Sequence, residues 1–332
     1  MKILFRVDAG SKIGLGHYFR SLNLAEQLQI RGHEVFYSHL KSEYWDSEIK
    51  KGFKFENITF DKDDEENRTY EFILENNIQI YYVDSIIDFS DTYISKLKKY
   101  VKVIFYQNLS ASKHLSDIFI LPSIHQDDEF FLPFSSDTEI FKGLDYLLFN
   151  SEISLLEPKN KYDPIISSIA IAAGGSDPKN TLLKIYELIK SLNIDNILFT
   201  FCFGVDYLFK ENIPKVLPPN IKFRIFNHSD IIEHDLLISS FGVSTYEFLY
   251  LGMPIISYGH QKSNATASDM LAMKIQSFIS LGNIDDITSL DLVKAINKIA
   301  NVQFRKELTN NAKQYIDLKG ADRIINIIES AN

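Results

Sequence analysis

The sequence is poor in cysteine and contains no long apolar run. Cys202 is the single cysteine among 332 residues, which excludes a disulfide framework and a multi-cysteine zinc site. No apolar stretch approaches the roughly 20 residues that cross a bilayer. The N-terminus leads directly into an expected strand and lacks the layout of a signal peptide. We therefore expect a cytoplasmic protein without a membrane span.

Positive charge is also scarce. The chain has 35 lysines and arginines against 44 aspartates and glutamates, for a formal net charge of −9. No basic field is available to neutralise a phosphate backbone, so nucleic acid is excluded as the main partner. The length favours two domains, and 45% hydrophobic residues provide enough apolar surface for a core in each.

Both halves of the chain alternate apolar runs with helical periodicity, which is typical of a doubly wound parallel sheet. A short polar segment with two prolines, residues 157–164, predicts a linker between domains 1–156 and 157–332. Residues 143–148 are expected to be extended. The expected fold is α/β, with two Rossmann-like domains facing a cleft. Whether the last helices pack back on the first domain is an open question at this stage. The main expected strands lie at 3–7, 32–37, 78–83, 101–106, 117–121, 165–173, 196–203, 221–226, 236–239 and 254–258.

The segment 8–20 joins the first expected strand to the first expected helix. Its three glycines, among them Gly14 and Gly16, let the backbone approach a ligand and adopt positive φ. Exposed N–H groups and the helix dipole favour an anion there. A histidine has an ordinary pKa near ~6.5, so His17 can exchange protons beside a bound phosphate. The alternative is structural: His17 bonds a backbone carbonyl and Arg20 is solvated. The segment also lacks the third glycine of the dinucleotide fingerprint.

The segment 242–247 is a second strand exit that begins a helix. Gly242, Ser244 and Thr245 can form an anion site at the helix N-terminus. Glu247, about one turn further on, can accept hydrogen bonds from a ribose diol. The ordinary alternatives are a helix cap for one hydroxyl and a glutamate that only compensates the helix dipole.

Two weaker candidates complete the set. Gly174 and Gly175 form the matching turn after the first strand of the second half, with a plain strand–helix turn as the alternative. His260 and Gln261 follow another strand and are candidate sugar contacts, although single polar loop residues more often have no specific role. The acidic run at 61–66 is typical of a solvated loop rather than a metal site. No metal and no cofactor are expected.

The phrase FRVDAGSKIGLGHYFRSLNLAEQL at 5–28 resembles the start of the PseG/SpsG family, whose best-understood members are UDP-sugar hydrolases of pseudaminic acid biosynthesis. Segments 143–153, 169–180 and 239–254 fit the same family in order. The resemblance implies a GT-B fold, as in MurG-type glycosyltransferases. It also implies metal-independent cleavage of the anomeric C–O bond of UDP-2,4-diacetamido-2,4,6-trideoxy-β-L-altropyranose, with inversion.

By this resemblance His17 is the base that activates water, and uracil lies near Phe226 and Asn227. The first turn frames the sugar and phosphate, and the helix at 243 holds the diphosphate and ribose. The residues expected to contact the nucleotide sugar are Gly14, Gly16, Arg20, Gly174, Gly175, Phe226, Gly242, Ser244, Thr245, Glu247, His260 and Gln261.

The chain departs from the family on the sugar side. An Asp-His-Tyr-like triplet becomes Asp84-Ser85-Ile86, paired aspartates become Gln107-Asn108, an expected arginine becomes Phe149-Asn150, and an asparagine-glutamine pair becomes His260-Gln261. Three hypotheses stay open. They are a UDP-sugar hydrolase in nonulosonic acid or surface-glycan synthesis, a GT-B glycosyltransferase acting on a surface glycan or flagellin, and a catalytically silent nucleotide-sugar binding protein.

Overall fold

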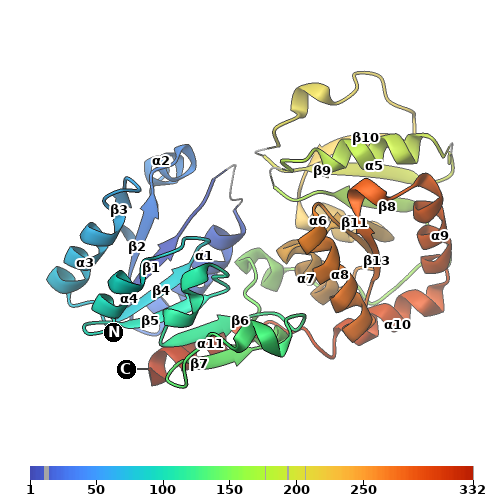
Figure 1. Ribbon diagram of the computed structural model, residues 1–332. Helices are drawn as coiled ribbons and strands as arrows, with labels where there is room; N and C mark the ends of the chain where they lie inside the picture. Colours follow the sequence, from blue (N-terminus) through green and yellow to red (C-terminus); the bar gives the residue numbers. More distant parts are fainter. Residues whose placement is uncertain (11–14, 176, 193, 206, 332) are drawn as a thin grey trace. The chain divides into compact units, whose positions relative to one another are not determined.

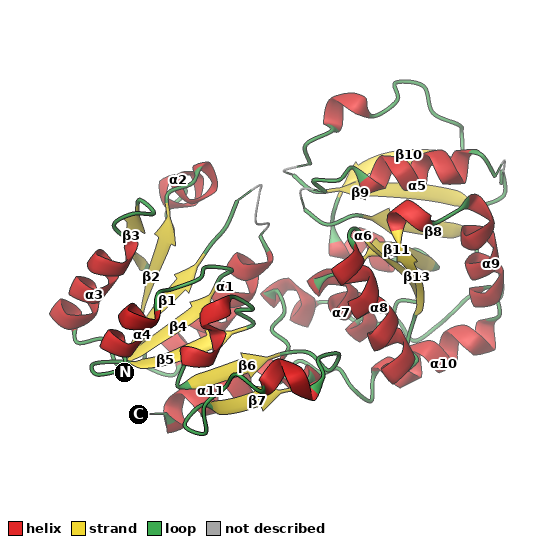
Figure 2. Cartoon of the chain, in the orientation of Figure 1, coloured by secondary structure: helices red, strands yellow, loops and turns green. Residues whose placement is uncertain are grey.

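The computed structural model describes residues 1–10, 15–175, 177–192, 194–205 and 207–331. Their contacts divide the chain into unit 1, Met1–Ser151 with Leu318–Asn332, and unit 2, Glu152–Asp317. Each unit is built around one parallel sheet with helices on its faces (Figures 1 and 2). The expectation of two doubly wound α/β domains is confirmed, while their placement across a cleft stays a prediction.

The described strands of unit 1 form a parallel sheet in the order β3-β2-β1-β4-β5-β6-β7. The central strand β1 is buried on both faces, as its nearly continuous apolar run predicts. The strand order reverses between β1 and β4, and ligands of open α/β sheets bind at the carboxyl edge of such a reversal. The strands are β1 (Lys2–Val7), β2 (Glu34–Leu40), β3 (Glu56–Phe60), β4 (Ile80–Asp84), β5 (Lys102–Tyr106), β6 (Ile118–Leu121) and β7 (Glu139–Lys142).

The C-terminal helix α11 (Gly320–Ser330) belongs to unit 1. Its Ile324 and Ile328 are fully buried in one apolar cluster with Ile3 and Phe5 of β1. The helix crosses beside β6 and β7 in Figure 1. The other helices of this unit are α1 (Gly16–Ile30), α2 (Glu43–Lys50), α3 (Glu65–Asn76), α4 (Asp91–Leu97) and the short 3₁₀ turns η1 (Ala111–Leu115), η2 (Asp128–Phe131) and η3 (Leu144–Tyr146).

The expectation of an extended segment at 143–148 is wrong. Gly143 has a φ of +127°, and the N–H of Leu147 bonds the carbonyl of Leu144 at 3.1 Å, which makes the 3₁₀ turn η3. The turn packs closely on α11, because a Cβ on Gly320 would lie 1.9 Å from the carbonyl oxygen of Leu147. Packing against a helix from the far end of the chain thus overrides the local apolar pattern.

Unit 2 has the same plan, with the described strands in the order β10-β9-β8-β11-β12-β13. Its reversal lies between β8 and β11. The strands are β8 (Ser168–Ala172), β9 (Leu198–Phe203), β10 (Ile221–Ile225), β11 (Leu236–Ser240), β12 (Ile255–Gly259) and β13 (Ile279–Asn283). The helices are η4 (Ser151–Leu155), α5 (Thr181–Lys190), η5 (Lys210–Asn212), α6 (His228–Ile232), α7 (Val243–Tyr250), α8 (Lys262–Ile275), η6 (Ile284–Asp286), α9 (Ser289–Ile299) and α10 (Val302–Ala312).

Candidate functional site

His17 lies at the second residue of α1 and contacts a carboxylate from the neighbouring strand. Its Nδ1 lies 2.6 Å from Oδ1 of Asp84, the last residue of β4. The Asp84 side chain is fully buried, whereas 17% of the His17 side chain is exposed. Because β1 and β4 pair in parallel, the helix that follows β1 and the last residue of β4 meet at the same sheet edge. The dyad therefore occupies the reversal point of unit 1.

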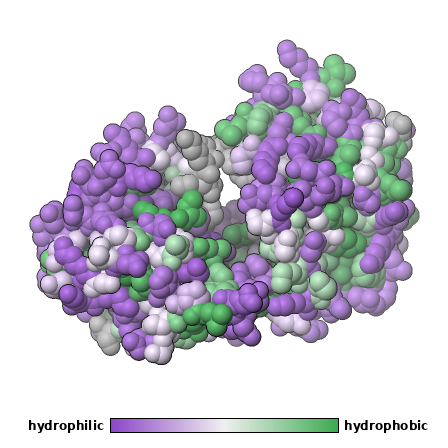
Figure 3. Space-filling model, in the orientation of Figure 1, coloured by the Kyte–Doolittle hydropathy of each residue, from purple (hydrophilic) through white to green (hydrophobic). Residues whose placement is uncertain are grey.

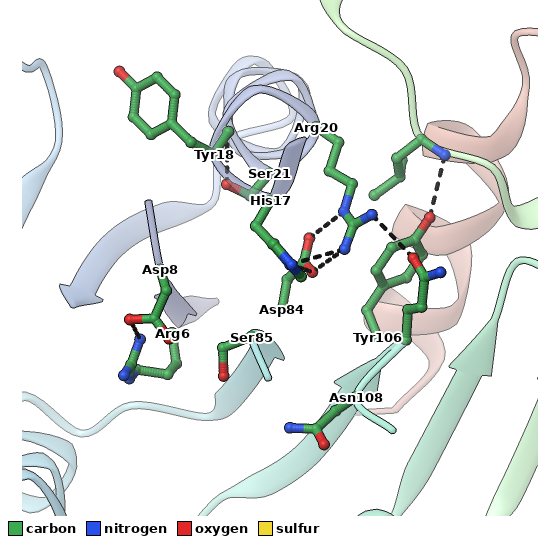
Figure 4. A network of polar contacts seen from close by, with 12 residues as sticks. Arg6, Asp8, His17, Tyr18, Arg20, Ser21, Asp84, Ser85, Tyr106 and Asn108 are labelled. Atoms are coloured by element: carbon green, nitrogen blue, oxygen red, sulfur yellow. Dashed lines mark hydrogen bonds and ion pairs between the residues drawn. The ribbon is translucent and has the colours of Figure 1, made fainter. Parts of the chain in front are cut away.

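Arg20, one helical turn after His17, completes the cluster. Its Nε donates to Asp84 Oδ2 at 2.6 Å and its Nη2 donates to Oδ1, so the pair is bidentate. Its Nη1 donates to Gln107 Oε1 at 3.0 Å, and the guanidinium lies 5.0 Å from the ring centre of Tyr106. Figure 4 shows His17 and Arg20 both directed from α1 towards Asp84.

The electrostatics keep Asp84 ionised. Burial raises the pKa of this carboxyl, but the charges and hydrogen bonds of Arg20 and His17 outweigh burial and hold the pKa below its ordinary value. Burial lowers the pKa of Arg20, and Asp84 more than compensates, so the guanidinium pKa lies above its ordinary value. The site thus holds a fixed ion pair next to a partly exposed imidazole.

The protonation state of the ring follows from its two neighbours. Nδ1 of His17 lies 2.6 Å from Asp84 Oδ1 and 2.9 Å from Arg20 Nη2. A carboxylate oxygen only accepts and a guanidinium nitrogen only donates, so Nδ1 can bond just one of them. The shorter contact requires a proton on Nδ1, because two lone pairs at that distance would repel. Whenever the ring carries a single proton, its lone pair therefore lies on Nε2, which makes no hydrogen bond within the described part of the chain.

A second buried ion cluster lies on β1. Arg6 is fully buried, its Nη1 donates to Asp8 Oδ1 at 2.6 Å, and its Nε donates to Glu65 of α3. Burial lowers the pKa of Arg6, and the two carboxylates raise it to a net value above the ordinary one. This cluster ties the carboxyl end of β1 to α3, without contacting His17.

The two glycine turns of unit 2 lie at its reversal point and at the neighbouring strand. Gly174 and Gly175 follow β8 and are exposed, and Gly174 has a φ of +84°. A Cβ on Gly204, after β9, would lie 1.9 Å from the Gly175 carbonyl oxygen, so the two turns pack backbone to backbone. The Asp177 carboxylate accepts from the N–H groups of Thr181 and Leu182 and caps α5.

The start of α7 follows β11 at the same edge. Gly242 is extended and open around its Cα, and its N–H donates to Thr245 Oγ1 at 3.2 Å. Thr245 is fully buried and its hydroxyl caps the start of α7 through this bond, whereas Ser244 is half-buried. Glu247 is 5% exposed, and its Oε2 accepts from Nε2 of His228 at 3.2 Å.

The remaining candidates spread over two loops. Phe226 is half-buried and its ring meets the edge of the His228 ring at a centroid distance of 4.9 Å. His260 is half-buried, and burial together with the charge of Lys179 lowers its pKa. Gln261 is exposed at the start of α8. Within the described residues, neither side chain hydrogen-bonds to Gly242, Thr245 or Glu247 at the start of α7.

The structure thus brings His17 and Arg20 together in unit 1, and Phe226 near Glu247 in unit 2. Gly16 is exposed at the start of α1, and Gly14 lies outside the described residues. The sequence reasoning missed Asp84 as the partner of His17 and assigned no role to His228. A signal for Asp84 existed, because a carboxylate that ends a strand adjacent to β1 must reach the same sheet edge.

Within the described residues, no group of three or more His, Cys, Asp or Glu side chains could hold a metal ion. In the same residues, no helix has the length and apolarity to traverse a bilayer. Hydrophilic side chains cover much of the face shown in Figure 3.

No protein-family model matches the chain. An uncharacterized protein of Methanocaldococcus jannaschii is 26% identical over 280 residues, which cover 77% of this chain and 55% of the relative. The spore coat polysaccharide biosynthesis protein SpsG of Bacillus subtilis is 21% identical over 344 residues, which cover 97% of this chain and 96% of that protein. The chain therefore spans about half the length of the first relative and nearly all of the second.

Solved structures share the fold across the whole chain. MurG of Acinetobacter baumannii has a TM-score of 0.67 at 12% identity, covering 99% of this chain and 100% of that one. The glycosyltransferase of kitacinnamycin has a TM-score of 0.70 at 12% identity, with 99% and 98% covered. CalG4, the calicheamicin glycosyltransferase, has a TM-score of 0.65 at 12% identity, with 99% and 98% covered. The expected GT-B type of fold is confirmed.

Proposed function

We propose that the protein hydrolyses a UDP-linked deoxy amino sugar, releasing UDP by cleavage of the anomeric C–O bond with inversion. The observation that carries the proposal is the His17–Asp84 pair at 2.6 Å, with Arg20 keeping the carboxylate ionised. The resemblance to SpsG, a protein of spore coat polysaccharide biosynthesis, supports a role in nonulosonic acid or other surface-glycan synthesis.

In this mechanism Nε2 of His17 removes a proton from water as the water oxygen attacks the anomeric carbon. The bond from that carbon to the diphosphate oxygen breaks, and its electron pair leaves with UDP. The ring becomes an imidazolium whose Nδ1–H remains bonded to Asp84, so the carboxylate stabilises the charge that develops. A diphosphate is a weak base and departs without a proton donor.

We assign the nucleotide to unit 2 in the same proposal. The extended, open Gly242 and the first N–H groups of α7 suit a diphosphate. Glu247 suits the ribose hydroxyls, and Phe226 suits the base. Gly174, Gly175, His260 and Gln261 complete the proposed substrate contacts.

A glycosyltransferase is the second candidate, because the solved structures that share the fold include glycosyltransferases. The two candidates differ in the acceptor that His17 deprotonates. A water molecule gives a hydrolase, and a hydroxyl of a glycan or protein gives a transferase.

The test is UDP release from UDP-linked amino sugars, followed by ³¹P NMR with and without added acceptors in ¹⁸O-labelled water. Hydrolysis at carbon places ¹⁸O in the sugar and none in UDP. The His17→Ala variant should lose at least about 100-fold in kcat, the smallest contribution of a positioned base. His114→Ala is the matched control, because His114 is a half-buried histidine of unit 1 whose one side-chain hydrogen bond among the described residues is to the Ala111 carbonyl. Full activity of His17→Ala contradicts the proposal, and release that requires an acceptor favours the transferase.

A further inference from the structure

His228 is buried between two carboxylates and two aromatic rings. Its Nε2 lies 3.2 Å from Glu247 Oε2 on α7, and its Nδ1 lies 3.3 Å from Glu152 Oε2 on η4. The ring centroids of Phe226 and Phe248 lie 4.9 and 5.3 Å away. The side chain is 9% exposed. His228 therefore contacts both Phe226, which is proposed to contact the nucleobase, and Glu247, which is proposed to contact the ribose.

Two carboxylate partners require two ring protons. A neutral imidazole carries one N–H, so it can donate to only one carboxylate. Both contacts are satisfied together when His228 is an imidazolium. Burial lowers the pKa of this ring, and the hydrogen bond and charge of Glu247 followed by those of Glu152 raise it to a net value above the ordinary one. Phe226 and Phe248 carry no charge, and Asp230 follows two residues later on α6.

We propose that His228, as an imidazolium, is a positioning residue that orients the Glu247 carboxylate towards the 2′- and 3′-hydroxyls of the nucleotide. The nucleotide site thereby prefers ribose to 2′-deoxyribose. This inference rests on the proposed function, in which Glu247 contacts the ribose. The preference arises because a buried carboxylate that is already bonded on one oxygen has a fixed direction for accepting from the diol.

The experiment measures the dissociation constants of UDP and 2′-deoxy-UDP for the full-length protein by calorimetry. Their ratio cancels the titration of the terminal phosphate, which both ligands share. The His228→Phe variant should lower the ratio about tenfold, because about one charge-assisted hydrogen bond to Glu247 is lost. His228→Gln, which keeps one donor, should retain part of the ratio. His234→Gln is the matched control, since His234 is also buried with both ring nitrogens bonded, to the Asp230 carbonyl and Thr200 Oγ1.

A second measurement needs no folded variant of His228. Nitrogen-15 spectra of the wild-type histidines at pH 7 should show one ring with both nitrogens protonated, in contact with Glu247, and the Glu247→Gln variant should shift that signal. An unchanged ratio in folded His228→Phe, or a neutral ring at that position in the wild type, overturns the inference alone. If the wild type binds neither nucleotide, the proposed function fails and this inference fails with it.

Discussion

Replacing Asp84 by asparagine tests the central cluster of unit 1. The carboxylate accepts from Nε and Nη2 of Arg20 and from Nδ1 of His17, and its side chain is fully buried. An amide group in its place turns one acceptor into a donor that faces other donors, and it leaves the guanidinium as an unpaired charge. Breaking a buried pair in this way costs about 3–5 kcal/mol of unfolding free energy. For a unit of this size we expect the melting temperature to fall by about 6–20 °C.

The same substitution removes the group that fixes the proton of His17 on Nδ1. The lone pair is then no longer held on Nε2, and the imidazolium loses its counter-charge during the reaction. We expect kcat for UDP release to fall by about 10²–10⁴-fold, the range of a positioned general base. KM should change little, because the proposed function assigns the nucleotide to unit 2. The pKa of Asp84 lies below its ordinary value, so its contribution is complete above about pH 4 and is lost as pH falls through the folded pKa.

The assay combines thermal unfolding at pH 7 and pH 3 with steady-state kinetics below the melting point. Glu65→Gln is the matched control, because it removes a buried partner of Arg6 in the same unit without touching His17. It should lower stability and leave kcat unchanged. An Asp84→Asn protein with wild-type kcat would refute the role of the carboxylate in positioning His17. Unchanged melting would refute the buried ion pair.

Three further predictions concern unit 2. Gly242→Ala should melt like the wild type, because the backbone at Gly242 is extended and no described atom beyond its chain neighbours lies within 4 Å of the added Cβ. The same variant should bind UDP more weakly, as measured by calorimetry. Unchanged binding would exclude Gly242 from the proposed phosphate site. Gly204→Ala should lower both stability and UDP affinity, because the new Cβ would lie 1.9 Å from the Gly175 carbonyl oxygen, and a crystal structure with unmoved turns would contradict this. The stability contributed by His228 should be complete below about pH 6.5 and lost as pH rises through its raised folded pKa. The test compares the unfolding free energies of the wild type and His228→Gln from about pH 6 to pH 9. A difference between the two proteins that is the same at every pH would contradict the assigned charge.

Much of the architecture could be predicted because it depends on local patterns. Apolar runs buried on both faces predict parallel strands, and β1 and β8 follow this rule. Because α1 follows β1 along the chain, His17 near the start of α1 is expected at the carboxyl edge of the sheet. Segment 143–148 shows the limit of this reasoning, because its conformation depends on packing against α11, which lies far away in the sequence.

The contacts within each site could not be predicted from spacing along the chain, because they depend on strand order and on side-chain direction. For Asp84 the one signal is its place at the end of a strand. His17 and Asp84 are 67 residues apart and meet because β1 pairs with β4. His228 and Glu247 are 19 residues apart, and no spacing rule connects the first residue of α6 with the second turn of α7. Such contacts follow from the fold, so a residue type and its distance along the chain carry no signal for them.

Gln107 and Asn108 are neighbours in the sequence but have different contacts. Gln107 accepts a hydrogen bond from Arg20 at 3.0 Å and adds no charge, so one cation and one anion lie beside the His17 imidazole. An aspartate at this position would add a second anion and compete with Asp84 for the guanidinium. Asn108 is fully buried and has a different role. Its Nδ2 donates to the Ile87 carbonyl, and its Oδ1 accepts from the N–H of Ser110. An aspartate there would lose the donor. The two positions must therefore be considered separately, because Gln107 contacts the Arg20 guanidinium and Asn108 stabilises the loop.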